Sequence, residues 1–143
     1  MDTNNKQISR RIFEEVWNNK KVDVVDELMA ENYVHHDPQS TIPGGVNGYK
    51  EFVHYYLHAF PDLRFTLEDE ISEGDTVVTR WTVTGTHQGD LNGLASTGKG
   101  ISVTGMTMAR VRNGRVVESW SNWDTLGMVQ QLGGSPEAKG RAA

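Results

Sequence analysis

Apolar residues recur at intervals of three or four positions in three stretches of the first 60 residues. This spacing puts apolar side chains on one face of a helix and polar side chains on the others. The pattern predicts helices over about residues 4–19, 22–29 and 46–60. Pro61 ends the third helix, because a proline disfavours helical geometry in the residue before it.

Beyond Pro61 apolar and polar residues alternate, which is typical of strands with one buried face. Four strands are expected, over residues 63–67, 76–87, 101–112 and 115–123. Asn113-Gly114 suits a two-residue hairpin turn, so the sheet is at least partly an antiparallel meander. Ahead of the third helix, residues 32–38 form a short extended piece that ends at Pro38.

The other segments are shorter or richer in glycine. Residues 88–100 predict a long, mobile loop that could cover a cavity. A short helix is expected over residues 125–132. We expect one domain over residues 1–133, followed by a flexible polar tail over residues 134–143.

Three helices that all precede the sheet must pack on one of its faces. We therefore expect an α+β fold, in which three N-terminal helices pack on a strongly curved, mostly antiparallel sheet. A sheet that curls around the helices makes an open cone with an apolar interior, which is a natural pocket for a small ligand.

Length, charge and composition narrow the function classes. The chain has 143 residues, enough for one domain, with 14 Lys and Arg against 19 Asp and Glu. Its net charge of −5 and the lack of a basic cluster argue against a nucleic-acid partner. Because no apolar run approaches the roughly 18 residues of a membrane span, and the N-terminus is unlike a signal peptide, we expect a cytoplasmic protein without a membrane partner. Cysteine is absent, so carboxylates, histidines, tyrosines and hydroxyls must carry any chemistry.

Asp124 is the main candidate for acid–base chemistry. Strict alternation from Val116 puts Trp120, Asn122 and Asp124 on one face of the last strand. A carboxylate beside large apolar groups is desolvated, which raises its pKa toward the range of a general base. The alternative is that Asp124 only caps the helix that begins at Thr125.

The neighbouring strands offer further candidates. Met106 and Met108 share a face and either line the pocket opposite Asp124 or pack in the core. Arg80 lies in a strand rich in β-branched residues, where it is either exposed to solvent or paired with a buried carboxylate such as Asp124.

Two adjacent histidines, His35 and His36, lie in the extended piece. Tyr33, His35 and Asp37 alternate with Val34 and His36, so at most one of the two histidines faces inward. A histidine near a cavity mouth could share proton transfer or hydrogen-bond a carbonyl group. Because adjacent strand residues point apart, no metal site is expected there.

The three other histidines have weaker claims to a function. His54 and His58 are four residues apart on the third helix and are expected to be exposed, and His87 is either structural or at the pocket rim. No Gly-x-Ser-x-Gly, phosphate-binding loop or dinucleotide fingerprint occurs in the chain.

Several short motifs occur in a characteristic order and spacing. They are Tyr33-Val34-His35-His36-Asp37-Pro38, Phe60-Pro61-Asp62, Gly85-Thr86-His87-Gln88-Gly89, Gly105, Val117-Glu118-Ser119-Trp120-Ser121-Asn122-Trp123-Asp124 and Gln131-Leu132-Gly133. Together they resemble the SnoaL-like polyketide cyclases, also called ester cyclases, of the nuclear-transport-factor-2-like superfamily. The resemblance covers residues 6–133.

This resemblance implies a cone-shaped α+β barrel with a deep apolar cavity, no cofactor and a homodimer formed through the sheet. It also implies that Asp124 removes a proton next to a carbonyl group so that an aldol reaction closes a ring. Met106 and Met108 stand where the cyclases have a polar residue and a histidine. The related limonene-epoxide hydrolases use an Asp–Arg–Asp set, of which Arg80 and Asp124 match two while Thr82 replaces the third.

Our first hypothesis is therefore a cofactor-independent enzyme that acts on a small or polycyclic carbonyl compound by aldol-type cyclisation or isomerisation, with Asp124 as base. Trp120 supplies an apolar wall, Asn122 with His35 or His36 orients the carbonyl, and Arg80 stabilises negative charge. The cavity shape depends on residues that include Trp17, Tyr33, Tyr56 and Met108. The alternatives are a non-catalytic protein that binds a hydrophobic ligand, and an oligomerisation module with a filled interior.

Overall fold

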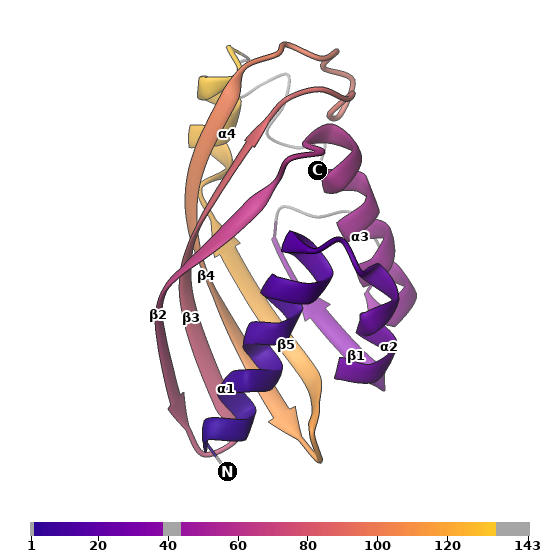
Figure 1. Ribbon diagram of the computed structural model, residues 1–143, viewed down its shortest axis with the longest axis vertical. Helices are drawn as coiled ribbons and strands as arrows, with labels where there is room; N and C mark the ends of the chain where they lie inside the picture. The colour runs from indigo at the N-terminus through magenta and orange to yellow at the C-terminus, as the bar shows by residue number, and fades with distance from the viewer. Residues whose placement is uncertain (1, 39–43, 134–143) are drawn as a thin grey trace.

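Helices cover the concave face of a curved sheet of five strands (Figure 1). The computed structural model describes residues 2–38 and 44–133. The tail predicted over residues 134–143 lies outside the described residues. Within them the α+β class and the packing of the N-terminal helices on one sheet face are confirmed.

The first predicted helix is present in two parts. Helix α1 (Asp2–Arg11) continues into a wider π-helical segment, Ile12–Asn18. The inward face of the π-helical segment is buried and comprises Ile12, Phe13, Val16 and Trp17.

The other helices lie close to their predicted positions. A 3₁₀ turn (Val22–Val24) leads into the short helix α2 (Val25–Leu28), and α3 (Gly45–Ala59) is the long third helix. Helix α4 (Thr125–Gln131) ends the described chain. None of the helices in the described ranges is long and apolar enough to span a membrane.

The sheet has the strand order β1-β5-β4-β3-β2. The four predicted strands are present, and each pair of consecutive strands is antiparallel. They are β2 (Arg64–Glu73), β3 (Thr76–Thr86), β4 (Gly100–Arg112) and β5 (Arg115–Trp123). The fifth strand, β1 (Met29–His36), is the extended piece expected over 32–38 and pairs in parallel with β5. It begins earlier than predicted, because Met29 leaves the helix and pairs with Val116.

A β-bulge in β5 decides which side chains reach the interior. Val111 pairs with Val116, but the preceding residue of β4, Arg110, pairs with Glu118, so Val117 is an extra residue in β5. One extra residue reverses the alternation of a strand from that point onward. Val116 and Ser119 are therefore both buried, although a regular strand would put them on opposite faces.

The segment expected to be a mobile loop is tied to neighbouring elements. His87 and Leu91 are buried, and the backbone N–H groups of Gln88 and Gly89 donate to the carbonyl of Ala59 at the end of α3. The backbone N–H of Asn92 donates to the Tyr55 hydroxyl at 2.7 Å. None of residues 88–100, all of which the structure describes, lines the cavity between the helices and the sheet, whereas Leu91, Asn92 and Leu94 line a smaller pocket beside α4.

Candidate functional site

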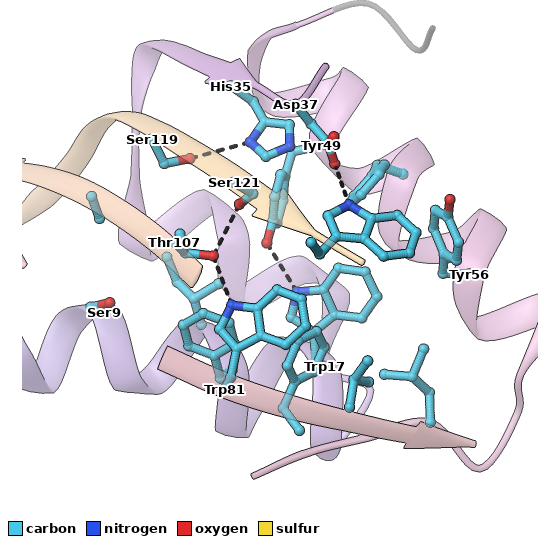
Figure 2. A pocket seen from close by; sticks show the side chains of 18 of the residues that line it. Ser9, Trp17, His35, Asp37, Tyr49, Tyr56, Trp81, Thr107, Ser119 and Ser121 are labelled. Atoms are coloured by element: carbon cyan, nitrogen blue, oxygen red, sulfur yellow. Dashed lines mark hydrogen bonds between the residues drawn. The ribbon is translucent and has the colours of Figure 1, made fainter. Parts of the chain in front are cut away.

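A cavity of about 80 Å³ lies between the helices and the concave face of the sheet (Figure 2). Its lining is mainly apolar and aromatic. The aromatic members are Phe13, Trp17, Tyr33, Tyr49, Phe52, Tyr56, Phe60, Phe65, Trp81 and Trp123. Trp17, Tyr33 and Tyr56, on which the cavity shape was expected to depend, belong to this lining, and the filled interior of an oligomerisation module is not observed.

Three tryptophans of the cavity wall are held by hydrogen bonds from their indole N–H groups. Trp17 donates to the Tyr49 hydroxyl at 2.9 Å, and Trp81 donates to Thr107 Oγ1 at 3.0 Å. Trp123 donates to Asp37 Oδ2 at 3.0 Å. Since a buried indole N–H needs an acceptor, these bonds fix the three rings and so the shape of the cavity.

His35 and Asp37 bring the titratable groups into the cavity. They lie at alternate positions where β1 ends, so both side chains enter from the same side (Figure 2). His35 Nδ1 lies 3.1 Å from the Tyr33 hydroxyl and 3.2 Å from Ser119 Oγ, and these two hydroxyls are 2.5 Å apart. His35 Nε2 is buried and has no hydrogen-bond partner among the described residues.

Burial sets the protonation states in this region. Desolvation lowers the pKa of His35 below its ordinary 6.5, with His36 adding to that effect and the Asp37 carboxylate opposing it. The imidazole is therefore mainly neutral at pH 7. Desolvation also raises the pKa of Tyr49 to about 12 and that of Tyr56 further, so both hydroxyls keep their protons.

The placement predicted for Asp124 is wrong. Its side chain is exposed, and its Oδ1 accepts a hydrogen bond from the backbone N–H of Gly127 at 2.9 Å. Asp124 is thus the N-cap of α4, which was the alternative reading of the sequence. The bulge at Val117 is the reason, because it turns Asp124 away from the face of Val116.

The same bulge overturns the expected positions of Trp120 and Asn122. Neither lines the cavity, and Asn122 is exposed. Trp120 instead packs on the outside, with its ring 5.2 Å from that of His36 in a stacked arrangement and 5.2 Å from the Arg110 guanidinium.

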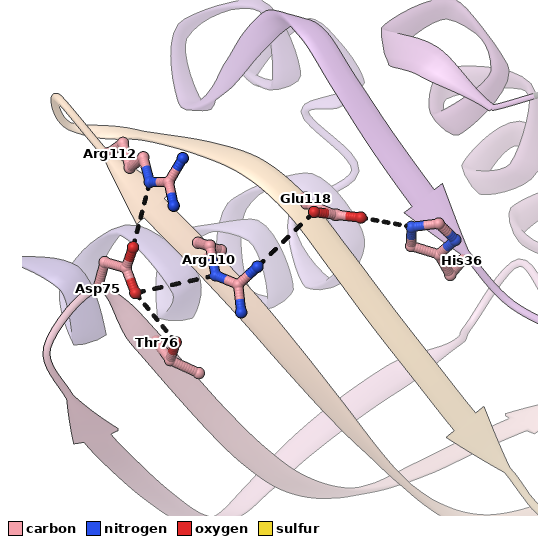
Figure 3. Close-up of polar contacts among 6 residues, drawn as sticks. All are labelled: His36, Asp75, Thr76, Arg110, Arg112 and Glu118. Carbon is pink, nitrogen blue, oxygen red and sulfur yellow. Dashed lines mark hydrogen bonds and ion pairs between the residues drawn. The ribbon is translucent and has the colours of Figure 1, made fainter.

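His36 also faces outward, so the prediction that at most one of the adjacent histidines points inward is confirmed. His36 Nε2 lies 2.7 Å from Glu118, which is 3.8 Å from Arg110, and Arg110 in turn lies near Asp75 (Figure 3). This chain of polar side chains lies on the face of the sheet away from the cavity. It offers no support for a role of His36 in orienting a bound carbonyl group.

Met106, Met108 and Arg80 do not line the cavity either. Met106 is 53% exposed, and Arg80 forms an exposed ion pair with Asp69 at 2.6 Å rather than with Asp124. The inward residue between the two methionines is Thr107. An Asp–Arg–Asp set of the epoxide-hydrolase kind is therefore not assembled around the cavity.

Sequence reasoning missed several polar residues of the lining. Asp37, directly after β1, shares the face of His35, and that alternation was sufficient to find it. Thr107, Ser119 and Ser121 also line the cavity. The serines could not be found without knowing where the bulge in β5 lies.

The three remaining histidines and the possibility of a metal site can be described briefly. His54 and His58 are exposed, as expected. His87 is buried against Phe60 and its Nδ1 lies 3.0 Å from Thr97 Oγ1, which agrees with the structural reading. Across residues 2–38 and 44–133, no three His, Asp or Glu side chains converge on a possible metal site.

Comparisons with known proteins identify the family and the fold. The model of the SnoaL-like polyketide cyclase family matches residues 7–132. The fold is similar to that of a candidate polyketide cyclase from Acidithiobacillus ferrooxidans, with 35% identity, a TM-score of 0.82 and coverage of 94% of this chain and 96% of that one. The comparison with curated proteins gives no match.

Two further solved structures have the same fold. IdmH from Streptomyces antibioticus, a candidate polyketide cyclase, is 31% identical with a TM-score of 0.79, covering 90% of this chain and 98% of its own. A candidate SnoaL-like polyketide cyclase from Jannaschia sp. CCS1 is 25% identical with a TM-score of 0.85, covering 94% and 95%.

Proposed function

The chain belongs to the SnoaL-like polyketide cyclase family, and from that premise we propose that it catalyses a cofactor-independent acid–base reaction on a small carbonyl compound. The reaction is an aldol-type ring closure or a related isomerisation. The observation that carries this proposal is the entry of His35, on β1, and Asp37, just after β1, into a mainly apolar cavity.

Asp37 is the base in this proposal. It is the one carboxylate among the described residues that line the cavity. The hydrogen bond from Trp123 Nε1 to Oδ2 orients the carboxylate, which takes a proton from the carbon next to the carbonyl group. Asp37 replaces Asp124 as the proposed general base, because Asp124 is exposed on the outside of the sheet.

His35 is the hydrogen-bond donor to the carbonyl oxygen. The hydroxyls of Tyr33 and Ser119 carry one hydrogen each. Both hydrogens are used when one hydroxyl donates to the other and the accepting hydroxyl donates its own hydrogen to His35 Nδ1. An accepting Nδ1 leaves the proton of the neutral imidazole on Nε2, the buried atom that has no partner in residues 2–38 and 44–133. This N–H stabilises the negative charge that develops on the oxygen as the enolate forms.

The size of the cavity favours a small substrate over a polycyclic one. Its volume of about 80 Å³ is well below the roughly 300–1,000 Å³ of pockets that enclose drug-sized ligands. A substrate with a single ring suits this space. The aromatic lining packs against its faces while His35 and Asp37 meet its carbonyl end.

Deuterium exchange tests the proposal without knowledge of the natural substrate. Cyclohexanone in D₂O is followed by NMR for exchange at the carbons next to the carbonyl group, with wild type and three variants. His35→Phe should lower the enzyme-dependent rate by roughly 10²–10³, as loss of one oxyanion donor does. His35→Gln, which offers an N–H near the position of Nε2, should retain a larger part, and His36→Gln is the matched control that keeps the full rate.

Two results would count against the proposal. Equal rates for His35→Phe and wild type would remove His35 from the reaction. If the wild-type protein binds cyclic ketones but accelerates no exchange, the chain is a ligand-binding protein, which was the alternative drawn from the sequence.

A further inference from the structure

A second polar site lies in the cavity at Thr107 and Ser121, on the adjacent strands β4 and β5 (Figure 2). The two residues form a register pair, and their hydroxyl oxygens are 3.0 Å apart. Trp81 Nε1 approaches the pair from β3 and lies 3.0 Å from Thr107 Oγ1. Ser121 lies two residues along β5 from Ser119, which corresponds to about 7 Å in an extended strand.

The hydrogens at this site can be counted. An indole N–H only donates, so Thr107 Oγ1 accepts from Trp81. The two hydroxyls carry one hydrogen each, and the bond between them uses one of these. Neither hydroxyl has another hydrogen bond within the described part of the chain, so one hydroxyl hydrogen remains to donate into the cavity, whichever way the Thr107–Ser121 bond runs.

We propose that Thr107 and Ser121 form a subsite for a second oxygen atom of the ligand, so that the preferred substrate is a small cyclic compound with two oxygen functions. One oxygen is the carbonyl at His35, which rests on the function proposed above. The other is an acceptor, a carbonyl or hydroxyl oxygen at the opposite end of the ring, bound by the free hydrogen of the hydroxyl pair.

Cyclohexane-1,4-dione and cyclohexanone make a matched pair of probes, since they differ only in the second carbonyl group. By the usual net strength of one hydrogen bond, wild type should bind the dione roughly 2–12-fold more tightly. NMR titration of the indole N–H signals locates each end of the probe. The Trp123 signal reports on Asp37, the Trp81 signal reports on Thr107, and Trp120 on the outside is the internal control.

The expected result is that cyclohexanone shifts the Trp123 signal, whereas the dione shifts the Trp123 and Trp81 signals together. If the dione binds no more tightly than cyclohexanone and leaves the Trp81 signal in place, the subsite proposal is wrong while the function at His35 stands. If the dione shifts only the Trp81 signal, the subsite stands and the proposed function at His35 fails.

Variants sharpen the test. Ser121→Ala leaves the Thr107 hydroxyl hydrogen free to donate, so the preference for the dione should persist. The double variant Thr107→Val with Ser121→Ala removes both hydroxyl donors but leaves the Trp81 N–H without its acceptor. Adding Trp81→Phe removes this last donor, and the triple variant should bind the two probes equally. A preference for the dione that survives in the triple variant would overturn the proposal, and the wild-type titration stands should that variant fail to fold.

Discussion

Trp123 donates its indole N–H to the Asp37 carboxylate at 3.0 Å, joining the end of β5 to the end of β1 across 86 positions of the sequence. This bond places a carboxylate in the cavity wall beside His35 (Figure 2). Because the indole is itself packed edge-on against Tyr56, with ring centroids 5.8 Å apart, the carboxylate is held by a rigid group. The site is therefore organised before any ligand arrives.

Replacing Trp123 with Phe removes this donor and leaves an aromatic ring. Hydrogen bonds to charged groups contribute about 1.5–3 kcal/mol, so the free energy of unfolding should fall by up to that amount. The rate of ketone deuterium exchange should fall as well, since the carboxylate loses its orientation. Urea denaturation and the exchange assay measure the two effects.

Trp120→Phe is the matched control, because Trp120 is on the same strand but packs outside against His36 and Arg110. It should keep the wild-type exchange rate. A lower rate in Trp120→Phe than in Trp123→Phe would show that the bond to Asp37 has no special part in the reaction.

Gly105 on β4 is predicted to be intolerant of a side chain. A Cβ at this position would lie 2.5 Å from Trp81 Cη2 and 2.6 Å from Trp123 Cβ, so both indoles would have to move. Overpacking of this kind costs about 1–3 kcal/mol, and it would also disturb both polar ends of the cavity. Gly105→Ala should therefore lower the melting temperature and weaken ketone binding.

Gly100→Ala on the same strand is the control for that change, since the nearest group that a Cβ there would meet among the described residues is the Gly85 carbonyl oxygen, at 3.8 Å. Its melting temperature and ketone binding should stay near those of wild type. Equal losses in the two variants would mean that the indole contacts do not explain the need for glycine at position 105.

The lowered pKa of His35 predicts a loss of stability toward acid. In the unfolded chain the imidazole takes up a proton near pH 6.5, whereas in the folded protein it does so only at lower pH. The unfolded state therefore binds more protons in this window, and the free energy of unfolding falls as the pH is lowered through 6.5 toward the folded pKa.

His35→Gln isolates this effect, because the other titrating groups are shared with wild type. Urea denaturation from pH 8 to pH 5 measures the unfolding free energies of wild type and His35→Gln. As the pH falls, wild type should lose stability relative to His35→Gln. A difference that is constant over the range would contradict the buried, neutral imidazole.

The N-cap role of Asp124 gives a prediction about stability alone. Asp124→Ala removes the acceptor for the Gly127 N–H and should lower the free energy of unfolding by about 1 kcal/mol. Asn caps helices about as well as Asp, so Asp124→Asn should be close to wild type. Thermal unfolding of the two variants checks the difference, and an equal loss in both would argue against the cap.

Much of the fold follows from local pattern. The helical stripes, the four antiparallel strands and the turn at Asn113-Gly114 are all encoded by neighbouring residues, and the structure has them near the predicted positions. Simple alternation also predicts that His35 and His36 point to opposite faces of the sheet. It holds because Val34, His35 and His36 pair with β5 in regular register.

The candidate site was predictable only in part, and the bulge in β5 explains why. Val116 and Val117 are identical in type, so nothing in the sequence marks which residue is the extra one. The bulge depends on pairing with β4, which is a non-local interaction. Strict alternation along β5, without the bulge, places Trp120, Asn122 and Asp124 on the inner face and Ser119, Ser121 and Trp123 on the outer face. The structure has the reverse.

The central claim is that Asp37, and not Asp124, is the base. The most direct measurement compares Asp37→Asn with Asp124→Asn in the deuterium exchange of a cyclic ketone, with circular dichroism to confirm that both variants fold. In Asp37→Asn the side-chain amide oxygen can still accept from Trp123, but the amide cannot take up a proton as a base. The account therefore predicts a rate lower by roughly 10²–10⁴ for Asp37→Asn and an unchanged rate for Asp124→Asn. A wild-type rate in Asp37→Asn together with a large loss in Asp124→Asn would contradict it.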